Sequence, residues 1–149
     1  MTDKLLGFTF VELLVVVAII GVIVVLISPL LPAGLQQGRD TRRKEDIKQY
    51  RQALENYAPN NNFVYPQHES TAVPASTTLC SELGSFISSC PQDPTGRDET
   101  FVYNYQSDSD GFNWVLWAKM ERSGNFWALC SNGRSGELSG VSISSCDTL

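Results

Sequence analysis

Residues 8–27 read FTFVELLVVVAIIGVIVVLI, a run of twenty with a single charged side chain, Glu12. Val and Ile are typical of strands, but the length of the run and the lack of a turn signal before Ser28 favour a helix. Twenty helical residues extend about 30 Å, the thickness of the hydrocarbon core of a bilayer. The run is therefore a membrane anchor, a secretory signal peptide, a buried helix, or a helix that packs against copies of itself.

Length and composition limit the classes of protein to which the chain can belong. The chain has 149 residues, 42% of them hydrophobic and 18% charged, with a net charge of −5. The length allows one domain with an appendage. The composition is too apolar for a disordered chain, and the net charge is too negative for the chain to attract nucleic acid. The single histidine, His68, has no acid, serine or cysteine at a motif spacing and is expected to be an exposed loop residue. We expect no enzyme, no cofactor and no nucleic-acid partner.

Charge is unevenly distributed after the apolar run. Residues 36–58 carry six basic side chains against four acidic ones, whereas residues 59–149 carry four basic against ten acidic. The six basic side chains, here named the basic collar, are Arg39, Arg42, Arg43, Lys44, Lys48 and Arg51. We expect a solvated helix face; the alternatives are contact with acidic faces of neighbouring subunits and capture of DNA, which the acidic chain disfavours.

The apolar run is interrupted and then continues as an amphipathic helix. Pro29, Pro32 and Gly34 follow it, and a helix is expected to kink or unwind there. Helical spacing then resumes at intervals of 3, 4 and 3, and the stripe consists of Ile47, Tyr50, Leu54 and Tyr57. The sequence from Ala58 onward, APNNN, should stop this second helix.

The second half of the chain has the pattern of a small antiparallel sheet. Residues 66–94 are loop-like, with one short helix near 81–88. Strands are predicted at 101–105, 112–120 and 126–131, joined by Gly-containing turns. Trp114, Leu116 and Ala118 alternate onto one face. A helix must cover that face, and the amphipathic stripe is suited to do so, which predicts an α+β fold.

Four cysteines, Cys80, Cys90, Cys130 and Cys146, all follow the helical region. None forms a CxxC pair, and one histidine does not complete a usual zinc set. Four cysteines can form two disulfides in three ways. The local one, Cys80–Cys90 with Cys130–Cys146, closes two loops, and the alternative is four reduced, buried thiols. An apolar run that points to export favours oxidised pairs.

Glu12 requires an explanation, since a carboxylate inside an apolar helix is costly unless it lies near an interface, is protonated or is paired. One interpretation places it in the headgroup region of an ordinary anchor. A second begins at the junction of Gly7 and Phe8. Cleavage there creates an amino group one helical turn from Glu12. That amine pairs with Glu12 of the same chain, or with Glu12 of a neighbour, which sets the axial register of packed helices.

These residues resemble a known signature. A short leader ending in Gly7, followed by FTFVELLVVVAIIG, is similar to the prepilin signature of type IV pilins and of the pseudopilins of type II secretion. The resemblance implies that a prepilin peptidase cleaves between Gly7 and Phe8 and that Phe8 becomes N-methylated. It implies that Glu12 is the carboxylate that pairs with the Phe8 amine of a neighbouring subunit.

The resemblance also implies the architecture, an α+β pilin fold. Its parts are a leader (1–7), an apolar stem (8–35), the amphipathic half of the stem helix (36–58), and a globular αβ-loop, antiparallel sheet and C-terminal loop (59–149). The stem is expected to be kinked or melted from Pro29, where many pilin stems bend, through Pro32 to Gly34. Disulfide-closed loops complete the fold.

The implied partners are identical subunits in a helical filament, the prepilin peptidase, an inner-membrane assembly platform with its motor ATPase, and the lipid bilayer before assembly. The leader is then cytoplasmic and the body outside, and the assembled filament is extracellular. The positive-inside rule opposes this topology, because the basic collar follows the apolar run while only Lys4 precedes it. The four cysteines agree with a body outside the cytoplasm.

A metal site is a further implication of the resemblance. Pseudopilins often hold calcium in an acidic C-terminal loop, and the carboxylates that such a site would use are Asp108, Asp110 and Glu137. A solvated hairpin turn explains the first two better, since Asp-Gly is itself a turn signal. We therefore expect no metal.

Three functions are compared. The first is a structural pilin of a type IV pilus-like filament on the cell surface, which two disulfides and a Ser/Thr-rich loop favour. The second is the major pseudopilin of a type II secretion system, which the segment CPQDPTG at residues 90–96 resembles. The third, of another class, is an exported monomeric binding domain whose signal peptide or anchor ends near residues 31–34. Glu12 and the length of the apolar run oppose the third.

Overall fold

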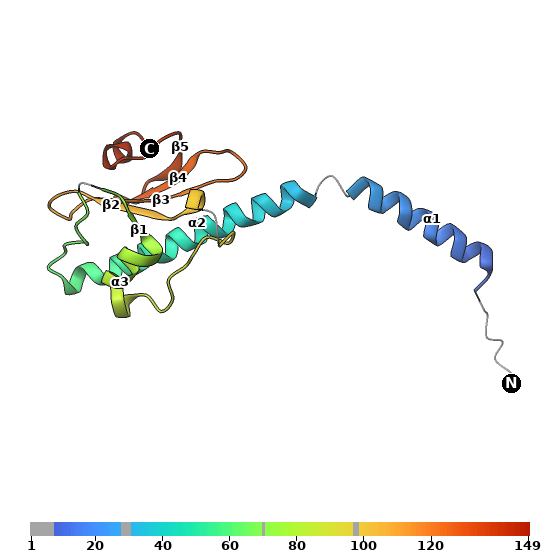
Figure 1. The fold of residues 1–149 in the computed structure, drawn as a ribbon, viewed down its shortest axis with the longest axis horizontal. Helices are drawn as coiled ribbons and strands as arrows, with labels where there is room; N and C mark the ends of the chain where they lie inside the picture. Colours follow the sequence, from blue (N-terminus) through green and yellow to red (C-terminus); the bar gives the residue numbers. More distant parts are fainter. Residues whose placement is uncertain (1–7, 28–30, 70, 97–98) are drawn as a thin grey trace. The chain divides into compact units, whose positions relative to one another are not determined.

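The computed structural model describes residues 8–27, 31–69, 71–96 and 99–149 (Figure 1). It forms two compact units, Met1–Leu35, here named the stem unit, and Gln36–Leu149, here named the body. The predicted leader of residues 1–7, with Gly7 at the cleavage site, lies outside the described residues, as does Pro29.

The stem unit contains helix α1, Phe10–Ile27, which begins two residues after the start of the apolar run. All its described side chains from residue 10 to 26 are exposed, so the helix has no cover within the stem unit. Within the described residues, no helix reaches the length and apolarity needed to cross a membrane.

Helix α2, Leu31–Tyr57, is continuous over 27 residues and is followed by the 3-10 turn η2, Ala58–Asn60. Pro32 and Gly34 lie inside this helix, and the rest of the segment near Pro29–Gly34 that is predicted to be kinked or melted, residues 28–30, lies outside the described residues. Pro32 occupies the first turn, where a backbone N–H has no partner within the helix and its loss costs nothing. Gly34 has open space around it, so nothing at that position forces a bend.

The predicted stripe on α2 covers the sheet. Ile47, Tyr50 and Leu54 are fully buried, and Tyr57 packs at the edge of the same cluster. The facing sheet residues are the predicted ones, Trp114, Leu116 and Ala118. The prediction that the amphipathic half of α2 packs on this face is therefore confirmed.

The sheet has five antiparallel strands in the order β1-β2-β3-β4-β5 (Figure 1). Their bounds are β1 Val73–Pro74, β2 Asn104–Ser107, β3 Trp114–Lys119, β4 Phe126–Cys130 and β5 Ser135–Leu138. Strands β3 and β4 match the predicted ranges closely. β2 starts later than predicted because the 3-10 turn η5, Glu99–Phe101, precedes it. β1 and β5 are additions that the sequence analysis did not predict.

The loop region before β2 is more helical than predicted. A short π-helix η3, Ala75–Leu79, leads into α3, Cys80–Leu83, and a 3-10 turn η4, Gly84–Phe86. Ala75, Leu79 and Leu83 are fully buried in the cluster that α2 shares with the sheet. Small and apolar residues in this Ser/Thr-rich stretch therefore complete one side of the core.

The second face of the sheet is also covered. Val115 and Trp117, which alternate with the α2-facing residues, pack with Ala128, Cys130 and Cys146. The 3-10 turn η6, Ile143–Asp147, brings the last residues of the chain over this face. The described structure pairs Cys130 with Cys146, and Cys80 with Cys90, with Cα–Cα distances of 5.8 and 5.9 Å. The first bridge links β4 to its C-terminal cover.

The stripe on α2 provides a direct test of the core. Replacing Ile47 by Ala should lower the free energy of unfolding by about 2–5 kcal/mol, since Ile47 is fully buried and a cavity remains. The neighbouring Lys48 is exposed, and Lys48→Ala should change the free energy by no more than about 0.5 kcal/mol. Denaturant unfolding of the detergent-solubilised chain, followed by fluorescence of the three tryptophans, all in the body, measures both. Equal effects of the two substitutions would contradict the assignment of the core face.

Candidate functional site

The surface of α1 is the most unusual feature of the described structure. Apart from Glu12, its side chains are apolar on all sides and exposed. Phe8 just before it is 81% exposed, and Val25 near its end is 72% exposed. A helix that is hydrophobic all round is stable only when lipid or protein covers it. Large exposed apolar surfaces of this kind are typical of membrane or protein contacts.

The first turn of α1 is closed by a reciprocal cap that the sequence analysis missed. The Thr9 hydroxyl accepts the backbone N–H of Glu12 at 3.3 Å. In return, Glu12 Oε2 accepts both the backbone N–H and the hydroxyl of Thr9, each at 3.0 Å. This is a capping box, and the spacing Thr-x-x-Glu before an apolar run was its signal in the sequence.

The cap determines which oxygen of the Glu12 carboxylate is still available to a partner. Its described hydrogen bonds all go to Thr9 through Oε2. The side chain of Phe8 is exposed beside this turn, and no described contact joins it to Glu12. Cleavage after Gly7, methylation of Phe8 and pairing of Glu12 with a neighbour's amine stay predictions.

The basic collar differs from a solvated helix face at its N-terminal end. Arg43 is completely buried. Its Nη1 lies 2.8 Å from Asp40 Oδ1 and 2.7 Å from Glu121 Oε1, and its Nη2 donates to Asp93 at 3.0 Å. Arg39 also pairs with Glu121, its Nε donating at 2.7 Å. For Arg43 the prediction of a solvated face is wrong, because acids of the same chain enclose it; the Arg39 side chain is paired but still 35% exposed.

Backbone groups join the same cluster. Asp40 accepts the main-chain N–H of Glu121 at 2.8 Å and of Arg122 at 3.1 Å. The turn between β3 and β4 is thereby tied to α2. On the other side, the ring of Phe101 lies 4.5 Å from the guanidinium carbon of Arg43, a cation–π contact.

The cluster lowers the pKa values of two of its acids, Glu121 and Asp93. Hydrogen bonds from Arg39, assisted by those from Arg43, lower the pKa of Glu121 to about 2. Burial alone would raise the pKa of Asp93, but hydrogen bonds from Arg43 and Thr95 outweigh it and the pKa is lowered. Burial likewise opposes the charge on Arg43, yet its three carboxylate partners raise its pKa. Glu121, Asp93 and Arg43 therefore stay charged near neutral pH.

The other members of the collar lie at the surface. Arg42 and Lys48 are exposed, Arg51 pairs with Glu55 one turn on, and the Lys44 ammonium lies 3.3 Å from Glu137. For these residues the helix face is solvated, as predicted.

The three carboxylates considered as calcium ligands lie apart, in a turn and in a strand. Asp108 accepts the N–H groups of Phe112 and Asn113 and the side-chain amide of Asn113, which fixes the turn between β2 and β3. Asp110 is exposed in that turn, and Glu137 in β5 pairs with Lys44. In the described ranges, no three His, Cys, Asp or Glu side chains gather closely enough to hold a metal ion.

His68 is more enclosed than predicted. Its side chain is only 18% exposed, its Nε2 lies 3.0 Å from both carboxylate oxygens of Glu82, and its ring meets that of Tyr105 edge-on. The prediction of an exposed loop residue is wrong, since the loop folds back between α3 and the sheet.

The cluster around Arg43 predicts a pH-dependent stability. The pKa of Glu121 is depressed from 4.5 to about 2, so the stabilisation is complete above pH 4.5 and is lost as the pH falls toward 2. Glu121→Gln should make this decline shallower and should lower the free energy of unfolding at pH 7 by about 3 kcal/mol, because a buried charge loses a partner. Denaturant unfolding at a series of pH values measures both effects.

The matched control is Glu55→Gln, which removes the partner of the half-exposed Arg51. At pH 7 it should cost less than about 1 kcal/mol. If the two variants lose equal stability at pH 7, the cluster does not contribute as its burial implies.

Comparison with known proteins identifies relatives. Type II secretion system core protein G of Escherichia coli (strain K12) is 31% identical over 109 residues, which cover 68% of this chain and 74% of the relative. The protein of the same name from Aeromonas hydrophila is 31% identical over 100 residues, 61% of this chain and 68% of the relative.

A third relative of that name, from Pseudomonas aeruginosa, is 40% identical over 60 residues, 40% of this chain and 42% of the relative. No protein-family model matches the chain, and no solved structure does. By its 31% identity to the Escherichia coli and Aeromonas hydrophila proteins over 74% and 68% of their lengths, the chain belongs to the family of type II secretion system core protein G.

Proposed function

We propose that the chain is a pseudopilin, a structural subunit without enzymatic activity that assembles into the pseudopilus filament of a type II secretion system. The shared name of the three relatives supports this function. The same relatives favour the secretion filament over the type IV pilus-like filament that the sequence analysis placed first. The monomeric binding domain has no support among them.

The exposed apolar surface of α1 carries the proposal. Each buried aliphatic or aromatic side chain gains about 1.5–3 kcal/mol over exposure to water, so a helix with nearly all of its side chains apolar and exposed requires a cover. Before assembly the cover is the lipid bilayer, and in the filament it is the corresponding helices of other subunits. Because lipid is as apolar as a helix, assembly from the membrane depends on close packing, on polar pairing and on an external motor.

Glu12 supplies the polar pairing. Cleavage before Phe8 places a new amine next to Thr9, at the same end of α1 as the Glu12 carboxylate. Thr9 occupies Oε2 of this carboxylate, which leaves Oε1 for the amine of a neighbouring subunit. Such a pair in an apolar environment has no competing water and sets the axial register of the stems.

The two disulfides support a body that faces an oxidising compartment. The proposed topology has the leader in the cytoplasm, the apolar segment in the membrane and the body outside. The partners in this scheme are identical subunits, the prepilin peptidase, and an inner-membrane platform with its motor ATPase.

Processing can be tested on protein from the native envelope without reduction. The intact mass should correspond to a chain that begins at methylated Phe8 and lacks the four hydrogens that two disulfides remove, and N-terminal sequencing should begin at residue 8. A chain that begins near Gly34 would indicate a cleaved secreted domain. A chain that retains Met1 would indicate a plain anchor, and both results contradict the filament subunit.

Assembly can be tested with a pair of variants at one helix end. Glu12→Ala removes both the cap and the carboxylate that pairs with Phe8, and it should reduce sheared filaments at least about tenfold while cleavage continues. Thr9→Ala removes only the capping hydroxyl, which costs about 1 kcal/mol, and should leave assembly largely intact. If both variants abolish filaments equally, Glu12 acts through the helix cap and not through pairing between subunits.

A further inference from the structure

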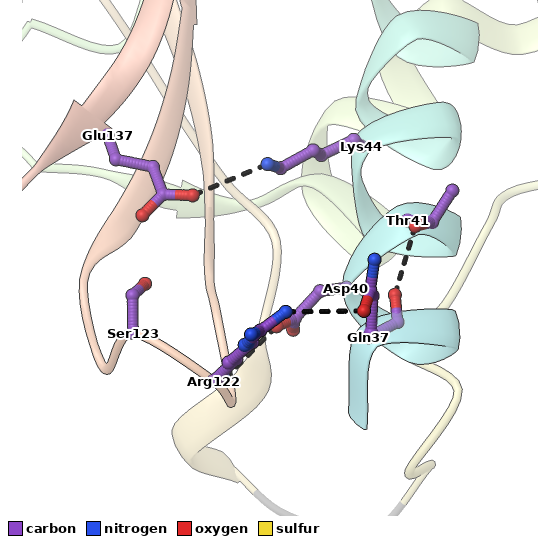
Figure 2. Close-up of a pocket in the computed structure, with 7 residues that line it drawn as sticks. All are labelled: Gln37, Asp40, Thr41, Lys44, Arg122, Ser123 and Glu137. Carbon is purple, nitrogen blue, oxygen red and sulfur yellow. Dashed lines mark hydrogen bonds and ion pairs between the residues drawn. The ribbon is translucent and has the colours of Figure 1, made fainter. Parts of the chain in front are cut away.

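The surface pockets of the body differ in charge. The pocket shown in Figure 2 has a volume of about 470 Å³, and its charged residues are Asp40, Glu137, Lys44 and Arg122. These charges cancel, and Lys44 already pairs with Glu137, so this pocket favours no charged ligand. A second pocket, of about 280 Å³, has no charged residue in its lining. It is therefore suited to an uncharged occupant.

This second pocket, here named the amide groove, lies between α2 and the segment that leads out of η4. Its wall on α2 consists of Gln49, Gln52, Ala53 and Asn56. Its other wall consists of residues 86–89, which lie within the loop that the Cys80–Cys90 disulfide closes. Phe86 on this wall meets the ring of Tyr57 edge-on, with the ring centres 5.6 Å apart. The disulfide and the ring contact therefore hold the groove in shape.

The amide groove keeps hydrogen-bonding groups that have no partner among the described residues. They are the side chains of Gln49, Gln52, Ser88 and Ser89. Each amide offers two N–H donors and a carbonyl acceptor, and each hydroxyl offers a donor and an acceptor. Phe86 and Ile87 add half-buried apolar surface to the same groove. An occupant that uses both kinds of surface carries an apolar group flanked by neutral polar ones.

Phe63, in the loop after η2, presents such a combination. Its side chain is 70% exposed and belongs to neither of the two buried hydrophobic clusters. No charged residue occurs from Ala58 to Gln67. The amides of Asn60 and Asn61 bind the last carbonyls of α2, whereas the Asn62 side chain makes no hydrogen bond to a described residue. The exposed ring therefore follows directly after a free amide.

The backbone holds Phe63 in a conformation that costs free energy. Asn62 and Phe63 have φ angles of 55° and 60°, in the left-handed region that bulky residues rarely adopt. The Phe63 N–H donates to the Ala58 carbonyl at 2.8 Å, which fixes this conformation. In the turn between β2 and β3 a glycine, Gly111, takes the left-handed position instead, so the exposed Phe112 after it needs no such strain. Strain that displays an aromatic ring unused by the core points to a function outside the chain.

We infer that Phe63 of one subunit inserts into the amide groove of the next subunit in the filament. A cavity of about 150 Å³ holds a benzene ring, so the groove has room for the phenyl ring and for part of the loop that carries it. The ring packs on Phe86 and Ile87, and the amide of Asn62 pairs with the free amides of the α2 wall. The inference rests on the proposed function, since it requires a filament of identical subunits.

A contact of this kind extends a filament because its two surfaces differ. The amide groove lies along α2 between Gln49 and Asn56, whereas Phe63 lies beyond the end of that helix. A contact between two different surfaces is heterologous and leaves one groove and one Phe63 free for further copies. Repetition gives a helical filament wherever the rotation does not close a ring. Insertion of an exposed apolar side chain into a pocket of the next copy thus joins body to body, in addition to the packing of the stems.

The contact can be tested by photo-cross-linking in filaments of the full chain. With p-benzoylphenylalanine in place of Phe63, irradiation of sheared filaments should give a band of twice the subunit mass. Mass spectrometry of that band should show position 63 linked to peptides that contain residues 49–56 or 86–89. The control carries the same group in place of Phe112, which is 59% exposed, and should not link to these peptides. A link from position 63 to any other surface, or no link between subunits, overturns the inference.

Phe63→Gly separates the contact from folding. Glycine adopts a φ of 60° without steric cost, and the side chain that is lost is exposed. The Tm of the subunit in detergent should therefore be within about 5 °C of that of the wild type, or higher. Sheared filaments should fall about tenfold or more, because an aromatic anchor of the interface is gone. A larger fall in Tm, which indicates a structural role, or an unchanged yield of filaments contradicts the insertion.

The groove is tested from its own side by Gln52→Glu. This change places a carboxylate where the Phe63 ring of the neighbour would bury it, and the yield of filaments should fall about tenfold. Gln92→Glu makes the same change at an exposed position outside the groove and should leave the yield unchanged. Equal yields from the two variants would show that the groove is not occupied.

The wild type separates this inference from the proposed function. Filaments that form from subunits cleaved before Phe8, but give no link from position 63, overturn the insertion alone. A wild type that is neither cleaved nor assembled overturns the proposed function and, with it, the insertion.

Discussion

The buried guanidinium of Arg43 sets the arrangement of the body. A charge without access to water must be matched by opposite charges with good geometry, and Arg43 draws its partners from three places: Asp40 on α2, Asp93 in the loop before β2 and Glu121 after β3. Apolar contacts such as those of the stripe on α2 have no preferred direction. The ion cluster does, because a shift of the helix by one turn leaves carboxylates and guanidinium apart. We therefore attribute to it the register between helix and sheet, more than net stability.

The sequence indicates the helix that covers the sheet but not the charge beneath it. Apolar residues at intervals of 3 and 4 indicate the buried face of an amphipathic helix. This pattern identified the stripe of Ile47, Tyr50, Leu54 and Tyr57. Arg43 lies four positions before Ile47 and so belongs to the same stripe. Its charge concealed this, since its partner Asp93 is 50 residues away and nothing local indicates the pair. Two signals were available: Arg43 is in line with a buried stripe, and Asp40 lies one turn before it on the same helix.

In the sheet, too, some strands form because of their own residues and others because of neighbours that are distant in the sequence. β3 and β4 are rich in aromatic and branched residues and were predicted from their own composition. β1 has two residues, one of them proline, and β5 contains Ser, Gly and Glu, so neither has a strong preference for extended structure. Both form because a neighbouring strand presents unpaired N–H and C=O groups. The C-terminal cover of the second face depends likewise on the Cys130–Cys146 bridge, which spacing alone left among three pairings.

The stem unit raises a different question, because the charged Glu12 lies in a helix that is otherwise apolar. The first turn is the part of an apolar helix in which a carboxylate costs least, because the first backbone N–H groups lack partners and the helix dipole is positive there. Glu12 occupies this turn, and Thr9 satisfies one of its two oxygens within the chain. A carboxylate deeper in α1 would have no such donor, and one before the helix would lie too far out to be shielded from water. The position of Glu12 therefore reconciles two requirements: it is stable in an uncovered apolar helix, and it keeps one oxygen for a partner outside that helix.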